Sequence, residues 1–277
     1  MKAWTKVTAS LPATPDDWSA WTYVFDRHGL PGTVQTDDPP TLSAYLPPGE
    51  SIALPALERD LVERGATVTT EQVEEQDWAE SWKQFFKPMH IGDRLVVRPP
   101  WEPYDRRPGE IVIELDPGQA FGTGDHPTTR LCLEILERMD LTGKSVADIG
   151  CGSGILSIAA MLLGAARADA VDADSPSVES TVANAARNSV LVSAYHGEGF
   201  GPLPPGRYDV VVSNIISAAV INLAPGAAQR TAAGGGWIVS GIIEANWPDV
   251  QKAVRTAGFS VERADVDGDW IAALLRR

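Results

Sequence analysis

Long apolar runs are missing from this sequence of 277 residues. No stretch of about 18 consecutive apolar residues occurs, so we expect no transmembrane helix and no membrane partner. The N-terminal stretch MKAWTKVTASLPATPDDW lacks the apolar core of a secretory signal, so we expect no export. Together these absences predict a cytoplasmic protein.

Cysteine is almost absent as well. Cys132 and Cys151 are the two cysteines of the chain, and neither belongs to a CxxC pair or has a histidine partner in a metal-binding pattern. A disulfide scaffold and a zinc site are therefore not expected, and the thiols indicate a reducing compartment. We predict no bound metal.

Positive charge is scarce relative to negative charge. The chain has 23 Lys and Arg against 37 Asp and Glu, which gives a net charge of −14. Direct binding of nucleic acid through a basic face is disfavoured, whereas a basic partner is favoured. A role of the charge in solubility alone accounts for it equally well, so both interpretations stay open.

Residues 1–75 predict a small α+β domain. Strand patterns are expected at 4–11, 32–36, 41–46 and 67–71, and helix patterns at 16–28 and 51–63. The order βαββαβ is that of a ferredoxin-like sandwich. This segment holds 12 acidic and 5 basic residues, so it contributes −7 of the net charge and has the highest acidic density.

Residues 76–92 are expected to form an interdomain helix or linker. In the stretch EEQDWAESWKQFF, Trp78 and Trp82 share one helix face with Phe85 or Phe86. Aromatic residues at this spacing favour packing between two domains.

Residues 93–277 predict a larger α/β domain. After a strand in RLVVRPP, strand patterns from Lys144 onward alternate with helices, and the stretch GFSVERADVDGDWIAALL closes as a pair of strands. Such alternation indicates a parallel sheet that is covered by helices on both faces. Ligands of these sheets bind beyond the carboxyl ends of the strands.

A glycine-rich turn follows the first of these strands, in the stretch VADIGCGSGILSIAA. Glycines let the backbone turn tightly and approach a ligand, and the following helix offers free N–H groups. Ile155 stands where a dinucleotide fingerprint needs glycine, and the Lys-Ser or Lys-Thr of a P-loop is absent. The turn, with Gly150 and Gly152, resembles that of class I S-adenosylmethionine (SAM) methyltransferases.

Two further strands end in polar residues. The second strand ends in VDAD, whose Asp172 can accept hydrogen bonds from both ribose hydroxyls, while Ser175-Pro176 favours Asp174 as the helix cap. Asn214 lies at the carboxyl end of the strand YDVVVSNI, where a side chain faces the ligand cleft. It keeps the asparagine of the Asn-Pro-Pro-Tyr motif of nitrogen methyltransferases but lacks the prolines and the aromatic residue. A turn role for Asn214 remains the alternative.

The stretch DPGQAFGTGDHPTTRLCLEIL precedes the glycine turn. Pro127 suits the first position of a helix, so His126 or Asp125 is expected to cap it. With this stretch in place, the chain resembles the methyltransferases of large-subunit ribosomal protein eleven, the PrmA family. The resemblance rests also on VDAD, NAARNSV, VSNII, LAPGAA, GGGWIVSGII and DWAESWKQFF, and it covers nearly the whole chain.

The resemblance implies a Rossmann-like catalytic domain, a ferredoxin-like substrate-recognition domain and a short helix between them. It implies SAM-dependent methylation of lysine side chains and of the N-terminal amine of the ribosomal protein. The positions that match the family's SAM contacts are Thr129, Gly150, Asp172 and Asn214. Those that match a loop closing over SAM are Phe121, Gly122 and Thr123. Ala173 and Ser175 depart from the usual Asp-Ile-Asp-Pro of relatives.

The sequence leaves the chemistry of the amine open. We expect Asn214, as a catalytic residue, or nearby carbonyls to orient the amine, whereas His126 is a candidate base with capping as the favoured role. The alternative functions are a class I methyltransferase for another protein lysine or a small molecule, and a non-catalytic SAM- or RNA-binding scaffold. An RNA-recognition fold needs aromatic residues within a basic stripe, and residues 1–75 are acidic instead.

Overall fold

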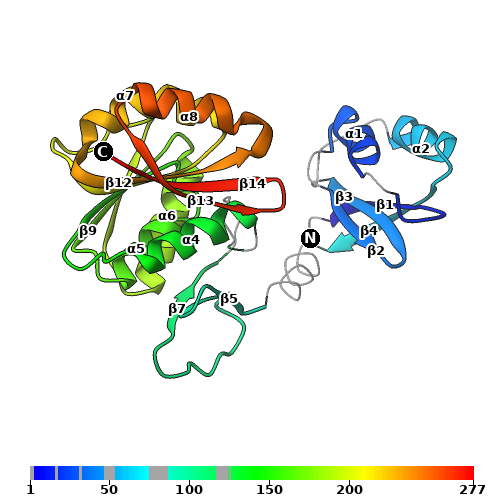
Figure 1. Cartoon of the computed structure of the whole chain (residues 1–277). Coiled ribbons are helices and arrows are strands. Elements are labelled where there is room, and N and C mark those ends of the chain that lie inside the picture. Colours follow the sequence, from blue (N-terminus) through cyan, green and yellow to red (C-terminus); the bar gives the residue numbers. More distant parts are fainter. Residues whose placement is uncertain are drawn as a thin grey trace. The chain divides into compact units, whose positions relative to one another are not determined.

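A computed structural model describes residues 3–15, 18–30, 33–46, 54–74, 87–116, 124 and 126–277. The chain divides into two compact units, residues 1–85 and 86–277 (Figure 1). The predicted aromatic helix with Trp78, Trp82, Phe85 and Phe86 lies outside the described residues, as do Phe121, Gly122 and Thr123.

The first unit is a four-stranded antiparallel sheet with two helices. Its elements are β1 (Ala3–Ser10), α1 (Ser19–Arg27), β2 (Val34–Asp37), β3 (Pro40–Leu46), α2 (Leu54–Glu63) and β4 (Thr67–Glu74). The strand order is β2-β3-β1-β4, with β1 paired to both β3 and β4. The core contains Phe25 from α1 and Leu57 and Leu61 from α2, which are fully buried against Val7 and Leu42 of the sheet. The element order is therefore βαββαβ.

The second unit begins with a three-stranded sheet of β5 (Met89–Ile91), β6 (Leu95–Arg98) and β7 (Ile111–Glu114). Strand β5 thus falls within the range 76–92 that was expected to link the domains. The backbone N–H groups of Asp93 and Arg94 donate to the carboxylate of Glu137 at 2.8 and 2.7 Å. Because Glu137 is in the last turn of helix α4 (Pro127–Arg138), this helix holds the β5–β6 turn.

The main sheet of the second unit has seven strands in the order β10-β9-β8-β11-β12-β14-β13. They are β8 (Ser145–Ile149), β9 (Arg167–Asp172), β10 (Val192–His196), β11 (Tyr208–Asn214), β12 (Thr231–Ile243), β13 (Ser260–Asp267) and β14 (Trp270–Arg276). Neighbours from β10 to β12 are parallel, whereas β14 is antiparallel to both β12 and β13. The predicted parallel sheet and the closing strand pair are confirmed.

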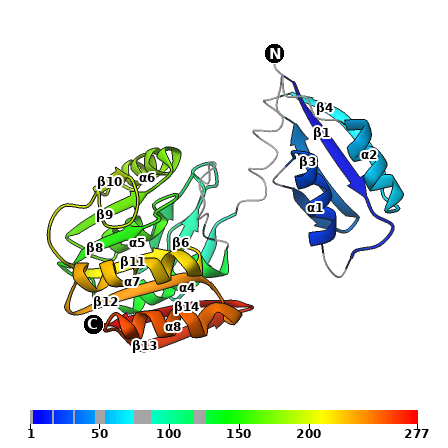
Figure 2. The same ribbon diagram turned by 90° about the horizontal axis from the view of Figure 1, so that it is seen from above.

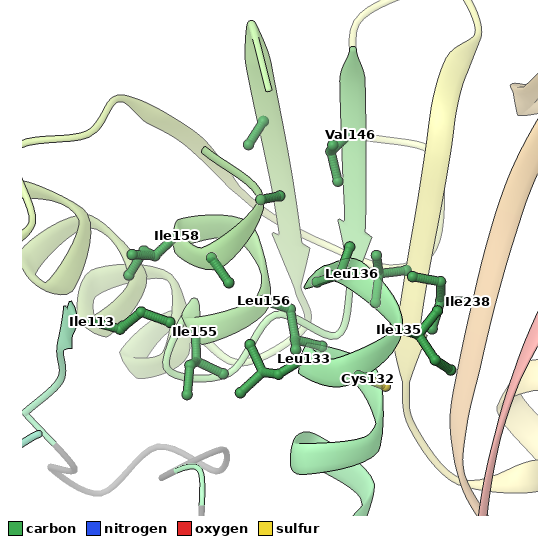
Figure 3. Packing of buried hydrophobic residues seen from close by; sticks show 14 of the residues in the cluster. Ile113, Cys132, Leu133, Ile135, Leu136, Val146, Ile155, Leu156, Ile158 and Ile238 are labelled. Carbon is green, nitrogen blue, oxygen red and sulfur yellow. The ribbon is translucent and has the colours of Figure 1, made fainter. Parts of the chain in front are cut away.

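Helices cover both faces of this sheet (Figure 2). Helices α4, α5 (Ile155–Leu162) and α6 (Ser175–Arg187) cover one face, and α7 (Ser217–Arg230) and α8 (Trp247–Thr256) cover the other, with a 3-10 turn η2 (Glu244–Asn246) before α8. The α4–α5 side packs Leu133, Leu136 and Leu156 against sheet residues such as Val146 and Ile238 (Figure 3). No described helix is long and apolar enough to span a membrane.

The order in which successive strands are added to the sheet reverses at one point. From β8 the chain proceeds to β9 and β10 on one side, and then crosses to β11 and β12 on the other. In open α/β sheets a crevice forms beyond the carboxyl ends of the two strands at such a switch point, here β8 and β11. Gly150 follows β8 and Asn214 ends β11, so two of the predicted site residues lie there.

Candidate active site

The glycine turn after β8 depends on a left-handed backbone. Gly150 and Gly154 have φ of +82° and +80°, and Gly152 has +52°. A Cβ atom at Gly154 would lie 2.8 Å from Thr181 Cγ2 and 3.0 Å from Thr181 Cα, so helix α6 packs directly on the turn. Gly154 is also the cap of α5, which gives the sharp change from strand to helix.

Asp172 joins the end of β9 to this turn. Its Oδ2 accepts a hydrogen bond of 2.9 Å from the Gly152 N–H, and its Oδ1 accepts one of 3.0 Å from the Asp174 N–H. Asp174 in turn caps α6, because its Oδ2 accepts from the N–H and hydroxyl of Ser177. The prediction that Asp174 is the cap of α6 is confirmed, and the ribose contact of Asp172 stays a prediction. Each Asp172 oxygen retains capacity for a second donor.

The two polar side-chain atoms of Asn214 differ in their hydrogen bonding. Its Nδ2 donates to Thr129 Oγ1 at 3.3 Å. Its Oδ1 is buried and has no hydrogen-bond partner among the described residues. A buried acceptor without a donor is costly, so this oxygen marks a place for a polar group that the described residues do not supply. Thr129 is itself fully buried and is not among the described residues that line the cavity below Asn214.

The residue after Asn214 is held between two glycines from neighbouring strands. A Cβ at Gly150 would lie 2.3 Å from Ile215 Cγ2. A Cβ at Gly241 would lie 2.3 Å from the Ile215 carbonyl oxygen and 2.7 Å from its carbonyl carbon. Gly241 has φ of +79° and lies where the pairing of β12 with β14 shifts register, between Val239 and Ile242. This bulge lets the Asn214–Ile215 backbone approach β12 closely.

His126 caps helix α4, as predicted for His126 or Asp125. Its Nδ1 accepts from the Thr128 N–H at 3.3 Å and lies 2.7 Å from Thr128 Oγ1. Pro127 is the first helical residue. The imidazole ring packs edge-on against Trp270 of β14, with centroids 4.9 Å apart and an interplanar angle of 69°. The capping role engages Nδ1 as an acceptor.

These elements surround one cavity of about 610 Å³. The residues that line it are His126, Thr128, Gly150, Gly152, Asp172, Ser177, Asn214, Ile215, Ile216, Ala219, Gly241 and Trp270. Four residues expected at the site from sequence, Gly150, Gly152, Asp172 and Asn214, therefore share one space. Its volume lies within the range of small-molecule sites.

Several lining residues were not found by reasoning from sequence. Trp270 and Gly241 come from β14 and β12, Ile215 and Ile216 lie between β11 and α7, and Ala219 is in the first turn of α7. The sole sequence signal was the glycine within the GGWIVSGII strand, since glycine inside a strand often marks a bulge or a close approach.

The electrostatics of the cavity favour a cation. Among the described lining residues there is one carboxylate, Asp172, and no Lys or Arg.

Two buried groups outside the cavity lining have raised pKa values. Asp148 is fully buried, and desolvation raises the pKa of its carboxyl group to about 6. Its Oδ2 accepts from Ser157 Oγ at 2.8 Å, and its Oδ1 has no partner among the described atoms. Burial also raises the pKa of the Cys132 thiol, to about 12, so this cysteine stays protonated.

The strand order, the switch point and the glycine turn define the fold of the class I, Rossmann-like methyltransferases. The chain belongs to the family of ribosomal protein L11 methyltransferases (PrmA), whose family model matches residues 27–277. The predicted Rossmann-like methyltransferase fold and the family resemblance are confirmed.

Relatives cover most of the chain. The ribosomal protein L11 methyltransferase of Pelotomaculum thermopropionicum is 40% identical over 271 residues, which cover 95% of this chain and 84% of that protein. The one from Desulforamulus reducens is 38% identical over 262 residues, with coverage of 91% and 84%. The crystal structure of ribosomal protein L11 methylase from Lactobacillus delbrueckii subsp. bulgaricus matches with a TM-score of 0.66 and 31% identity, and covers 69% of this chain and 99% of that one.

Proposed function

We propose that this chain uses SAM to methylate the amines of ribosomal protein L11, namely lysine side chains and the N-terminal amine. The observation that carries the proposal is the buried, unpartnered Oδ1 of Asn214, at the switch point and in one cavity with Asp172 and the glycine turn. The relatives named above are ribosomal protein L11 methyltransferases, which supports the choice of substrate. The cytoplasm, where both cysteines would stay reduced, suits this role.

The residues of the cavity fit SAM. Each Asp172 oxygen can accept one further hydrogen bond, as from a ribose hydroxyl, and Gly150 and Gly152 of the glycine turn line the same cavity. A cavity with a carboxylate and without cationic lining residues among those described suits a sulfonium. Bound SAM supplies the activated methyl group, so the chain has to align and desolvate the amine.

Two groups of this chain would prepare the amine. At pH 7 the neutralisation of a lysine with an ordinary pKa of about 10.4 costs about 4.6 kcal/mol. The apolar side chains of Ile215, Ile216 and Trp270 at the cavity disfavour a charged amine and so lower its pKa. Asn214 Oδ1 then accepts an amine hydrogen, which points the nitrogen lone pair toward the methyl donor.

The two units are proposed to divide the work. Residues 1–75 would recognise the protein substrate, residues 76–92 would link the domains, and residues 93–277 would bind SAM and catalyse. The acidic excess of the first segment matches a basic substrate, and every described lining residue of the cavity comes after position 115. A chain that starts near residue 87 should bind SAM with unchanged affinity and fail to methylate L11. Full-rate methylation by that shorter chain would refute this division.

Intact-mass analysis tests the function. The purified chain is incubated with SAM and L11, and the expected result is a mass increase of L11 in steps of one methyl group. Asp172→Ala serves as the control for cofactor dependence. Methylation of another protein in a cell extract, with L11 unchanged, would replace L11 as substrate, and label confined to small molecules would exclude a protein substrate altogether.

A further inference from the structure

Helix α6 holds the glycine turn through its buried face. Thr181 Oγ1 donates to the Gly152 carbonyl at 3.0 Å, and Asn184 Nδ2 donates to the Ser153 carbonyl at 3.0 Å. Thr181 and Asn184 are 0% and 1% exposed, so water does not compete for these carbonyl groups. The position of the turn is therefore set from the side of α6 as well as by Asp172.

The same helix face holds a second segment, at the end of β7. Asn184 Oδ1 accepts from the Asp116 N–H at 3.1 Å. One turn further along, Asn188 Oδ1 accepts from the Glu114 N–H at 2.8 Å, and its Nδ2 donates to the Glu114 carbonyl at 2.6 Å. The two asparagines of the NAARNSV stretch thus bind residues 114–116 much as a neighbouring strand would.

Asn184 differs from Asn188 in one respect. Its side-chain amide joins two segments: Nδ2 donates to the Ser153 carbonyl of the glycine turn, and Oδ1 accepts from the Asp116 N–H after β7. The backbone partners of Asn188, in contrast, are Glu114 and its own helix. If the β7 segment moves away, Oδ1 of this buried amide loses its donor. If the turn moves away, Nδ2 keeps only its longer bonds to Ser180 Oγ at 3.4 Å and to the Asp116 carbonyl at 3.5 Å. Either movement leaves a buried polar group poorly satisfied, which is unfavourable. The two segments are therefore most stable when both are in place.

We infer that Asn184 is a positioning residue that couples the glycine turn of the cofactor site to the chain at the end of β7. The inference rests on the proposed function, because the turn is the proposed SAM site. When SAM orders the turn, Asn184 holds Asp116 more firmly, and the fixed Asp116 segment in turn favours SAM binding. Such coupling is reciprocal in its effect on affinity.

Two alanine variants on one helix separate coupling from general stability. Asn184→Ala is expected to weaken SAM binding, measured by calorimetry, about tenfold, which corresponds to about 1.4 kcal/mol. Asn188→Ala removes bonds to the same β7 segment and none to the turn, so its SAM affinity should stay within about threefold of wild type. Melting temperatures measure the stability loss of each. Equal SAM affinity in the two variants would overturn the inference, whereas a wild-type chain that does not bind SAM would contradict the proposed function instead.

A second measurement uses the unaltered chain, so it does not depend on whether Asn184→Ala folds. Site-resolved hydrogen exchange is recorded with and without SAM. With SAM bound, the exchange rate of the Asp116 amide hydrogen should fall at least about fivefold. The ordered turn holds Asn184, whose Oδ1 accepts the hydrogen bond from this amide. The Asp93 amide, which donates to Glu137 at 2.8 Å on another part of the unit, is the matched control and should not change. Unchanged exchange at Asp116 in a chain that binds SAM would overturn the coupling.

Discussion

Asn214 Nδ2 donates a hydrogen bond of 3.3 Å to Thr129 Oγ1, although the two residues are 85 positions apart. This bond fixes the side-chain amide so that Oδ1 is the atom left without a partner among the described groups. Thr129 is not among the described lining residues of the cavity, and it contributes to the site by orienting the Asn214 side chain. Its expected direct contact with SAM stays a prediction.

Asn214→Ala should reduce turnover without abolishing SAM binding. The variant removes the proposed amine acceptor, and misplacement of a reacting group costs about 10²-fold in rate. SAM affinity should change little, because the ribose and turn contacts remain. Steady-state methylation of L11 and calorimetry with SAM give the two quantities, and normal turnover with normal affinity would remove Asn214 from the chemistry.

Asp172→Ala should weaken SAM binding by about 1.5–3 kcal/mol, the range for a lost hydrogen bond to a charged group. It also removes the acceptor of the Gly152 N–H, which loosens the turn. Asp174→Ala is the matched control two residues away. It should lower stability by about 1 kcal/mol through the lost helix cap and leave SAM affinity unchanged. Equal effects of both variants on affinity would show that Asp172 has no specific role.

Gly241→Ala should lower kcat at least about tenfold, because its Cβ meets the Ile215 backbone and must displace the Asn214–Ile215 segment. Gly234→Ala is the control in the same strand. Gly234 also has a left-handed φ, +72°, but a Cβ there meets nothing within 4 Å. Both variants should lose about 1–2 kcal/mol of stability from the left-handed backbone. If kcat falls equally in both, the contact with Ile215 does not position the site.

Asp148 should make the folded state less stable as pH rises from about 4 to about 6. Burial raises the pKa of its carboxyl group in the folded chain from 3.8 to about 6, so the folded state binds the proton more tightly than the unfolded state. Stability therefore falls with rising pH between these values, and the full penalty, about 3 kcal/mol, is present above pH 6.

The measurement compares wild type with Asp148→Asn in urea unfolding across this pH range. The asparagine does not titrate, so the stability of the wild type relative to the variant should decrease from pH 4 to pH 6 and then level off. Parallel profiles would show that Asp148 does not change its protonation state differently on folding.

Local patterns predicted the parts of the site that lie next to one another along the chain. The glycine turn, the capping of α6 by Asp174, and the start of α4 at Pro127 all depend on residues within a few positions. Each follows from backbone freedom, capping or the fixed φ of proline. The alternation of strands and helices likewise predicted the parallel part of the sheet.

The rest depends on contacts between distant segments. Trp270 and Gly241 reach the cavity because β14 inserts antiparallel beside β12, and no local pattern states which strand lies beside which. The roles of Asn184 and Asn188 were equally hidden, since an asparagine inside a helix has no intrinsic preference for a partner far away in sequence. Of the three strands in the sheet from β5 to β7, the sequence pattern predicted only β6, in the stretch RLVVRPP.

The two ends of helix α4 contact different parts of the second unit. Thr129 near its start orients Asn214, and Glu137 near its end holds the turn of residues 92–94. An inserted or deleted residue between them would rotate one end against the other by about 100° and shift it by about 1.5 Å. Either Thr129 or Glu137 would then face the wrong neighbour. The number of residues between Thr129 and Glu137 is therefore constrained from both ends of the helix.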